Sequence, residues 1–399
     1  MTGLKEKLSA VISEEELKDK IMDIVRIPTY PGIPGQETPA AEYVKSICDA
    51  EGIECTVQEV EDGRSNAYAR LKGTGGGKTL LFNGHLDTVD LQNMPKGCEP
   101  WIEDGKIYGR GTSDMKGPDI CMLMAMVALK RAGIKLPGDV LFCGTAGEEM
   151  NVLGAIDAIE KGIKADGAVV GEPTDFGICT AHRGVEWYEF HFIGKTVHGG
   201  NQSEGINAIF QAMKFVQAVK DELAPAVFAR KHPILKEATV NVGIIKGGTG
   251  LSTVPGDCTV WVDRRFLPEE KFEDVGQEFQ NILDKLAAED PTFKCEMKIM
   301  DVSVMKPGYV PAPMETDRKD PIVLSAKKAV AEALEETPDI TFFPGWTEAG
   351  LYRTYAGIPT IVYGPGLLAN CHSEREYIPL EHLKKGCLSY ALIAADFCS

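Results

Sequence analysis

Short apolar runs alternate with segments of helical periodicity along this chain, and the alternation limits the folds that it can adopt. Four runs are continuously apolar and only three or four residues long, as expected of strands buried on both faces: 80–82, 140–142, 168–170 and 360–363. Four other segments carry apolar residues at helical spacing: about 40–50, 118–132, 152–161 and 321–334. Buried strands that alternate with helices predict an α/β fold with a mostly parallel sheet, in which ligands bind at the carboxyl ends of the strands.

The middle of the chain follows a different pattern, in which the expected elements have the order β-α-β-β-α-β of a ferredoxin-like unit. The expected strands are 187–193, 239–245, 258–266 and 293–300, and the expected helices are 205–223 and 269–286. A chain of 399 residues is also long enough for two domains. We therefore expect a discontinuous catalytic domain, 1–181 and 302–399, interrupted by an inserted ferredoxin-like α+β domain at 182–301.

Charge and cysteine content exclude several classes of function. The chain has 59 acidic and 42 basic residues and a formal charge of -17, which argues against nucleic-acid or anionic-membrane binding as its main task. The longest apolar stretch, 120–129, is well short of the ~20 residues of a membrane span. The 11 cysteines include no C-x-x-C pair, so neither a disulfide framework nor a thiolate zinc site is indicated.

Ser13 and Glu16 have the spacing of a capping box, which predicts a mature helix rather than a signal peptide, and we expect a cytoplasmic protein.

Potential metal ligands follow the apolar runs at five places. They are His85 with Asp87, Asp114, the pair Glu148–Glu149, Glu172 and, far downstream, His372. Imidazole nitrogen and carboxylate oxygen are ligands that Zn²⁺ takes in proteins, and a further carboxylate can take a proton from water activated there. Neighbouring residues of an extended segment point in opposite directions, so one carboxylate of the Glu148–Glu149 pair can bind metal while the other acts as a base.

Each of these motifs also has a structural interpretation. His85 and Asp87 share one face of a strand end, so Asp87 can hydrogen-bond the ring nitrogen that His85 does not offer to metal, or the two can form a purely structural pair. Asp114 and Glu172 can cap helices, and the Glu148–Glu149 pair can open a helix in solvent. All five motifs in order, each behind a predicted strand, favour a hydrolytic metal site.

The motifs resemble, in order, those of the dizinc aminoacylase and carboxypeptidase superfamily, which includes acetylornithine deacetylase, succinyl-diaminopimelate desuccinylase, glutamate carboxypeptidase and dipeptidases. The resemblance rests on GHLDTVD, YGRGTSDMKG, GTAGEEM, VVGEPTD, HRG, TVHGG and CHSEREYI, and it spans nearly the whole chain.

The resemblance implies a two-zinc centre, in which Co²⁺ or Mn²⁺ can substitute for zinc. Asp114 is then the bridging carboxylate, and Glu148 is the general base of amide hydrolysis, with Asp87 supporting the site. The remaining ligands divide into two pairs, one for each zinc: His85 with Glu172, and Glu149 with His372.

The resemblance also implies a homodimer, because in the family a histidine of the partner subunit's small domain stabilises the oxyanion. His198 matches that position, although a plain turn histidine is the alternative. Arg265 matches the arginine that holds a substrate carboxylate. Many members carry an asparagine shortly before the Val-Pro of this region; here Ser252 lies nearby, and its hydroxyl can still hydrogen-bond.

The substrate expected from the resemblance is a small N-acyl amino acid or dipeptide, with no nucleic acid or membrane partner. Thr347-Glu348-Ala349 and Gly364-Pro365-Gly366 look closest to the acetylornithine deacetylase branch. A pocket containing Gly364 and the carboxylate of Glu348 favours a cationic side chain, unless Glu348 caps the helix near Leu351 or pairs with Arg353. A desuccinylase or a metallo-dipeptidase is the alternative. A metal-binding homologue without catalysis is disfavoured by the presence of Glu148, and Cys371 is expected to be ordinary packing.

Overall fold

The structure, a computed structural model, describes residues 2–91 and 94–399. These residues form two units: the first runs to His182 and resumes at Met314, and the second is Arg183–Pro313. From the sequence we expected the chain to return to the first unit after Asp301. In the structure the short helix η3 (Asp301–Ser303) and the extended residues after it belong with the second unit.

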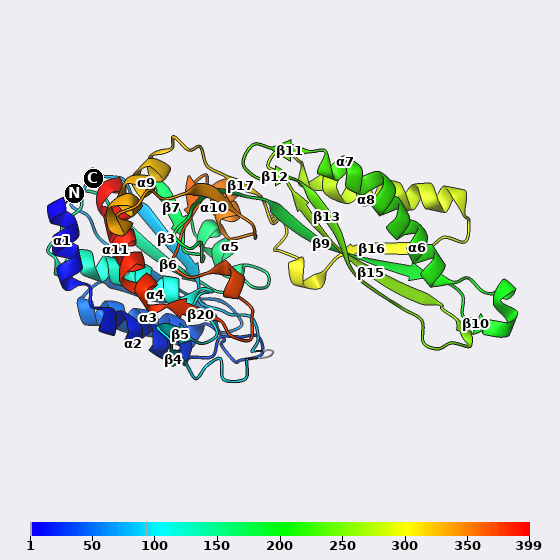
Figure 1. Ribbon diagram of the computed structural model, residues 1–399, viewed down its shortest axis with the longest axis horizontal. Coiled ribbons are helices and arrows are strands. Elements are labelled where there is room, and N and C mark those ends of the chain that lie inside the picture. The colour runs from blue at the N-terminus through cyan, green and yellow to red at the C-terminus, as the bar shows by residue number, and fades with distance from the viewer. Residues whose placement is uncertain (1, 92–93) are drawn as a thin grey trace. The chain divides into compact units, whose positions relative to one another are not determined.

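A nine-stranded sheet forms the centre of the first unit (Figure 1). Its strands have the order β1-β2-β6-β3-β7-β19-β8-β17, and β18 also pairs with β8. They are β1 (Glu54–Glu61), β2 (Arg64–Leu71), β3 (Leu80–His85), β6 (Val140–Thr145), β7 (Gly167–Val170), β8 (Ile178–His182), β17 (Met314–Glu315), β18 (Ile340–Phe343) and β19 (Thr360–Val362). The four central strands β6, β3, β7 and β19 are parallel, whereas β1, β2 and β17 pair antiparallel. The α/β class with a mostly parallel sheet is therefore confirmed.

Helices cover both faces of this sheet. A Cβ added to Gly84 of β3 would collide with Asp119 of α4 (Lys116–Arg131), whereas the side chain of the preceding Asn83 reaches Tyr352 of α10 (Ala349–Tyr355). Successive residues of a strand face opposite sides, so α4 and α10 lie on different faces. The other helices of the unit are α1 (Thr2–Val11), α2 (Glu14–Val25), α3 (Thr38–Glu51), α5 (Leu153–Glu160), α9 (Pro321–Leu334), η4 (Leu368–Asn370) and α11 (Leu380–Phe397).

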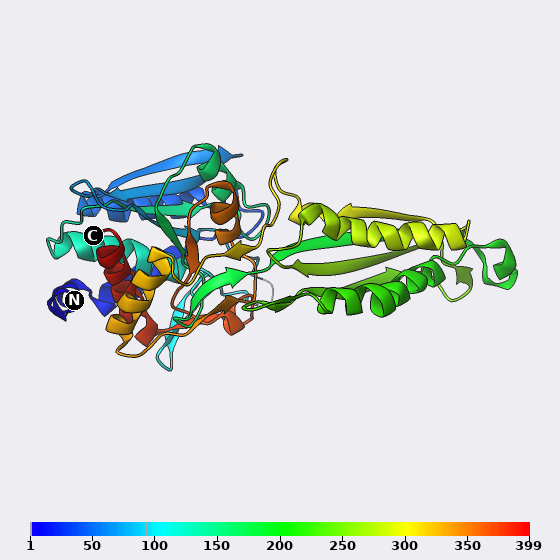
Figure 2. The same cartoon turned by 90° about the horizontal axis from the view of Figure 1, so that it is seen from above.

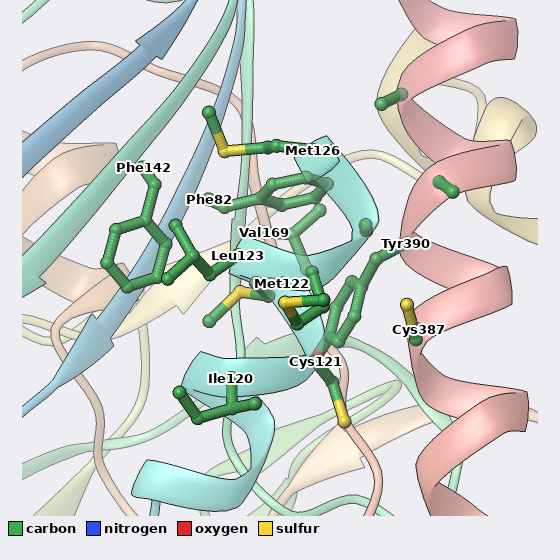
Figure 3. Packing of buried hydrophobic residues seen from close by; sticks show 14 of the residues in the cluster. Phe82, Ile120, Cys121, Met122, Leu123, Met126, Phe142, Val169, Cys387 and Tyr390 are labelled. Carbon is green, nitrogen blue, oxygen red and sulfur yellow. The ribbon is translucent and has the colours of Figure 1, made fainter. Parts of the chain in front are cut away.

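The core of the first unit lies where α4 and α11 meet the central strands (Figure 3). Phe82 of β3 and Tyr390 of α11 make an edge-to-face contact with ring centroids 5.4 Å apart. Met122 and Leu123 of α4 are fully buried in the same cluster. Because α4 is apolar on nearly all sides, it is enclosed by the sheet and by other helices, which explains the long apolar run in the sequence.

The second unit contains a four-stranded sheet of order β13-β15-β9-β16 and two long helices (Figure 2). In chain order the elements are β9 (Gly184–Ile193), α6 (Ala208–Ala218), β13 (Thr239–Gly247), β15 (Asp257–Phe266), α8 (Phe272–Glu289) and β16 (Cys295–Ile299). Phe190 of β9 packs against Phe215 of α6 and Phe279 of α8, with ring centroids 4.4 and 5.3 Å apart. The smaller elements are β10 (Val197–His198), η1 (Gly199–Glu204), η2 (Val219–Leu223), α7 (Ala224–Phe228), β11 (Lys231–His232), β12 (Lys236–Glu237) and β14 (Thr253–Val254).

The helix expected over 205–223 is not continuous α-helix. The structure has α6 followed by η2, a π-helical turn, which the apolar periodicity could not distinguish from α-helix. The sequence also left unassigned the three-stranded sheet of β4 (Trp101–Glu103), β5 (Lys106–Tyr108) and β20 (Tyr377–Pro379). The side chain of Ser13 caps α2 as expected, by accepting from the Glu16 N–H. Over the described residues, no helix combines the length and apolar character needed to cross a membrane.

Candidate metal centre

The four parallel strands end at one edge of the sheet, and each is followed by a residue that the sequence singled out. His85 is the last residue of β3, and Glu148 and Glu149 come shortly after β6. Glu172 follows β7, and Gly364 follows β19. Because the strand order is β6-β3-β7-β19, the fold brings these segments next to one another.

Asp114, just before α4, lies between the two histidines. Its Oδ1 is 3.0 Å from Nε2 of His85, and its Oδ2 is 3.3 Å from Nε2 of His372. The Nε2 of His85 is also 3.9 Å from Oε1 of Glu172, and that of His372 is 3.0 Å from Oε1 of Glu149. The five side chains thus form two groups that share the carboxylate of Asp114, and Glu148 belongs to neither.

The spacing of these donor atoms fits divalent cations. Ligand atoms ~2.0–2.2 Å from a tetrahedral zinc ion lie about 3.3–3.6 Å from one another. The four histidine–carboxylate separations in the two groups range from 3.0 to 3.9 Å, which brackets this value. His85, Asp114 and Glu149 each offer one ligand atom, and these three atoms lie within 4.8 Å of one another. Nitrogen and carboxylate oxygen together are a donor set that suits zinc.

The electrostatics of the site indicate a shortage of positive charge. Burial raises the pKa of Glu172 and of Glu148 well above the usual range, and neighbouring carboxylates raise both further. Hydrogen bonds that His372 donates to the carboxylates of Asp114 and Glu149 raise its pKa to about 11. Although burial opposes it, hydrogen bonding to the two histidines holds the pKa of Asp114 well below its usual range. Bound divalent cations are the charge that such a set of carboxylates needs.

Asp87 supports this centre in a way that differs from the sequence-based expectation. The closest contact of the His85 Nδ1 is with the main-chain oxygen of Asp87, at 3.0 Å, and the Asp87 carboxylate is 3.5 Å away. That carboxylate instead accepts hydrogen bonds from the backbone N–H groups of Gly147, Glu148 and Glu149, at 3.0, 3.1 and 3.1 Å. Asp87 therefore holds the loop that carries the candidate base.

Sequence reasoning missed two residues of the site, Arg110 and Glu376. Arg110 Nη1 donates to Glu376 Oε2 at 2.6 Å, and both side chains are buried. The other carboxylate oxygen of Glu376 accepts from the backbone N–H of Asp114 at 3.1 Å. Glu376 follows His372 by four residues in a polar segment, so nothing in the sequence distinguished it from a surface charge.

Three of the residues expected at the site belong to the second unit. His198 lies on β10, is exposed, and accepts from the Gly200 N–H through Nδ1 at 3.1 Å. Ser252 is exposed, and its carbonyl accepts from the N–H of Gly199 at 2.7 Å. The guanidinium of Arg265 is paired with Asp263, two residues earlier on β15, at 2.9 Å.

Glu348 and Gly364 are both buried in the first unit. Glu348 is 1 % exposed, and its Oε2 accepts from the Thr145 hydroxyl at 2.7 Å. Its side chain neither caps α10 nor contacts Arg353, whose Nε donates to the Glu315 carbonyl. The backbone of Gly364 is bonded to Thr174 in both directions, and a Cβ added there would lie 2.4 Å from the Gly171 carbonyl oxygen. Glu348 is thus bonded to Thr145 and Gly364 to Thr174 in the interior of the first unit.

Cys371 lies beside His372 but takes no part in either ligand group. Its thiol donates to the Leu367 carbonyl at 3.6 Å, and burial raises its pKa above the usual range. Both observations fit a packed, unreactive thiol.

Comparison with known proteins places this geometry in a family. Residues 81–396 match the model of peptidase family M20/M25/M40. The chain is 31% identical to the acetylornithine deacetylase of Myxococcus xanthus, over 90% of this chain and 92% of that protein. It is 27% identical to the N-formyl-4-amino-5-aminomethyl-2-methylpyrimidine deformylase of Bacillus subtilis, over 96% of this chain and 95% of that protein. Among solved structures, aminopeptidase PepT from Bacillus cereus superposes with a TM-score of 0.78 at 25% identity, covering 97% of this chain and all of that one.

Proposed function

The chain belongs to peptidase family M20/M25/M40, whose members hydrolyse amide bonds, and on that premise we propose that it removes the acyl group from an N-acyl amino acid. The single observation that carries the proposal is the pair of histidine–carboxylate groups that share Asp114, with Glu148 beside them. Such a centre suits the hydrolysis of an unactivated amide, because that reaction needs both a nucleophile generated at neutral pH and a polarised carbonyl.

Two zinc ions are the proposed cofactors, held by His85 and Glu172 on one side, by His372 and Glu149 on the other, and by Asp114 between them. When bound, the ions lower the pKa of water and polarise the acyl carbonyl. Glu148 takes the proton of the attacking water and then delivers it to the leaving nitrogen.

The metal proposal is tested by stoichiometry. Metal analysis after mild dialysis should approach two equivalents per chain, and chelation followed by readdition of Zn²⁺ should remove and restore activity. Co²⁺ and Mn²⁺ serve as substitutes in the same experiment. A chain that is fully active with one equivalent contradicts the two-ion centre.

The identity of the acyl group that is removed is the more specific part of the proposal. The relatives named as a deacetylase and a deformylase both release an amine from an N-acyl compound, which supports deacylation. Desuccinylase and dipeptidase activities are the alternatives. A panel of N-acetyl, N-formyl and N-succinyl amino acids and dipeptides, each assayed with the zinc-loaded protein and with Glu148→Gln as the blank, ranks them by kcat/KM. A dipeptide that is preferred over every N-acyl amino acid contradicts the proposal.

We also propose that the protein is a homodimer, with the second unit as the dimerisation surface. β13 is an edge strand of the four-stranded sheet, and its Ile244 and Ile245 are each 50% exposed. Phe210 and Met213, one turn apart on α6, are 57% and 56% exposed. Exposed apolar side chains beside an unpaired strand edge are features of a self-association surface. Sedimentation equilibrium should show a dimer for the natural chain and a larger monomer fraction for the double variant Phe210→Asp, Met213→Asp.

His198 is proposed to act in the partner's active site. Because the Gly200 N–H donates to Nδ1, the neutral ring carries its proton on Nε2, which is therefore a donor available to an oxyanion. Mixing two nearly inactive variants, His198→Ala and Glu148→Gln, tests this. If the histidine acts across the dimer, random heterodimers contain one complete site, and about a quarter of the natural activity returns. No recovery, with heterodimers demonstrated, contradicts the assignment.

A further inference from the structure

Glu376 occupies a position that no step of the proposed reaction uses, yet it lies four residues after His372 and contacts the loop that carries Asp114. We propose that Glu376 is a positioning residue that fixes the loop carrying Asp114 to the segment carrying His372, and thereby sets the affinity for the second cation. This inference rests on the proposed metal centre. It concerns how the chain holds its ligands rather than the reaction itself.

One carboxylate oxygen of Glu376 collects the backbone donors of the Asp114 loop. Its Oε1 accepts from the N–H groups of Gly111, Ser113 and Asp114, at 3.0, 3.1 and 3.1 Å. Glu376 is 0 % exposed, so these bonds have no competition from water. Three such bonds to one buried oxygen fix the loop directly at the residue whose two side-chain oxygens face the two histidines.

The second oxygen of Glu376 is held by Arg110, which also reaches the segment next to His372. Arg110 donates Nη1 to Glu376 Oε2 at 2.6 Å and Nη2 to the Ser373 carbonyl at 3.2 Å. The Gly109 N–H donates to the Glu376 carbonyl at 3.1 Å. The two segments, far apart in sequence, are thus joined through both side chains and backbone.

The segment that carries His372 needs such support. His372 has a φ of +58°, a left-handed backbone conformation that non-glycine residues adopt only where the surrounding structure determines it. Its side chain is 50% exposed, so packing alone does not fix the ring. The Arg110–Glu376 pair is buried, and Glu376 lies only four residues after His372 in the sequence.

A second carboxylate supports the centre in the same way, which argues against coincidence. Asp87, two residues after His85, accepts three backbone N–H groups of the loop that carries Glu149. Glu376, four residues after His372, accepts three from the loop that carries Asp114. In each case, a carboxylate from the segment of a histidine ligand holds the loop of a carboxylate ligand.

Glu376→Gln tests the inference with little change in volume. One amide oxygen can replace one carboxylate oxygen, but the amide NH₂ then faces a donor, either Arg110 or the three backbone N–H groups. Titrating chelator-treated protein with Zn²⁺ by calorimetry, below the unfolding midpoint of each variant, should show two equivalents for the natural chain. For Glu376→Gln the second equivalent should bind about tenfold to a hundredfold more weakly, the usual effect of removing a partner of a metal ligand. The exposed Glu374→Gln, in the same segment, is the matched control and should bind as the natural chain does.

The outcomes separate this inference from the proposed function. If the natural chain never binds two equivalents, the metal centre itself is wrong. If the natural chain binds two and Glu376→Gln binds the second with unchanged affinity, the positioning role is wrong. Should Glu376→Gln fail to fold, Arg110→Lys decides the question, because it removes the link to Ser373 and leaves the carboxylate with its three backbone donors. The same weakening is then expected, and unchanged affinity overturns the proposal.

Discussion

The two units of this chain hold their buried charges in different ways. In the first unit, Asp87 and Glu376 each accept three backbone N–H groups. In the second unit, the guanidinium of Arg264, which is fully buried, is neutralised by the side chains of Glu270 and Glu278. The backbone donors fix loops of the first unit, whereas Glu270 and Glu278 neutralise a buried cation of the second.

The cores differ correspondingly. The second unit is centred on a cluster of aromatic rings, including Phe190, Phe215 and Phe279, and it leaves apolar side chains such as Phe210 on its surface. The first unit places carboxyl groups of its candidate metal centre, those of Glu149 and Glu172, after buried strands. One unit is therefore organised to hold charge at fixed positions, and the other to pack and to associate. Substitutions in the two units should change different observables.

The largest effect is expected from Glu148→Gln. General acid–base catalysis contributes about 10²- to 10⁴-fold to a rate, so kcat should fall by that factor. Because Glu148 belongs to neither ligand group, the zinc content and the unfolding midpoint should stay unchanged. Steady-state kinetics with metal analysis measures both, and the exposed Glu42→Gln is the control. Retention of most of the rate contradicts the assignment of the base.

Phe215→Ala should produce the largest change confined to the second unit. Its ring is fully buried against Phe190 and Phe192, and truncating a buried phenylalanine costs about 3–5 kcal/mol of unfolding free energy. Urea unfolding followed by far-UV circular dichroism measures the loss, with Phe228→Ala, whose ring is 42% exposed, as the control. Zinc stoichiometry should not change. A loss of one zinc equivalent per chain would contradict the independence of the two units.

Asp119→Asn should stabilise the first unit. Both carboxylate oxygens of Asp119 are buried without a hydrogen-bond partner, and burial raises its pKa well above the usual range. The native state therefore keeps this proton at pH values where the unfolded chain, with a carboxyl pKa near ~3.9, has released it, so this group lowers stability as the pH rises. We expect Asp119→Asn to gain ~1–3 kcal/mol at pH 8 and progressively less towards pH 4.

Urea unfolding of chelator-treated protein across this pH range measures the gain without a contribution from bound metal. The exposed Asp19→Asn is the control. A gain that does not depend on pH would show that the carboxyl of Asp119 has an ordinary pKa.

The smallest effect is expected from Glu348→Gln. A carboxylate that paired with a cationic substrate would contribute ~1.5–3 kcal/mol, or about tenfold or more in the ratio of kcat/KM for acetylornithine over acetylmethionine. Because Glu348 is buried and bonded to Thr145, we expect a much smaller change in that ratio. A tenfold change would place the carboxylate in the substrate pocket after all.

Sequence patterns predicted the central strands and the clustering of ligands at their ends for a physical reason. Strands buried on both faces read as continuous apolar runs, and β3, β6, β7 and β19 are of this kind. Because these strands are parallel neighbours, the polar residue that comes at the end of each strand lies at the same edge of the sheet. His85, Glu149 and Glu172 are brought together by this placement.

The supporting residues could not be predicted in the same way. Glu376 acts through backbone N–H groups of a distant loop, and any loop of suitable shape provides such donors whatever its side chains are. Glu348 was placed in a pocket on its resemblance to the acetylornithine deacetylase branch, and only the fold shows that Thr145 bonds it. Asp119 lies directly before an apolar run, where the sequence gives no sign that a carboxyl group lacks a partner.

The interruption of the first unit by the second has a consequence for biosynthesis. A ribosome completes every strand and helix of the second unit before it reaches Met314, while the first unit still lacks β19, α11 and His372. Nascent chains at that stage already carry His85, Asp114, Glu149 and Glu172, but the ligand group that includes His372 cannot close. Domains generally begin to fold during translation, in the order in which they emerge. Uptake of the second cation should therefore require synthesis of the chain through His372, and fragments that end before His372 should leave the ribosome without a complete centre.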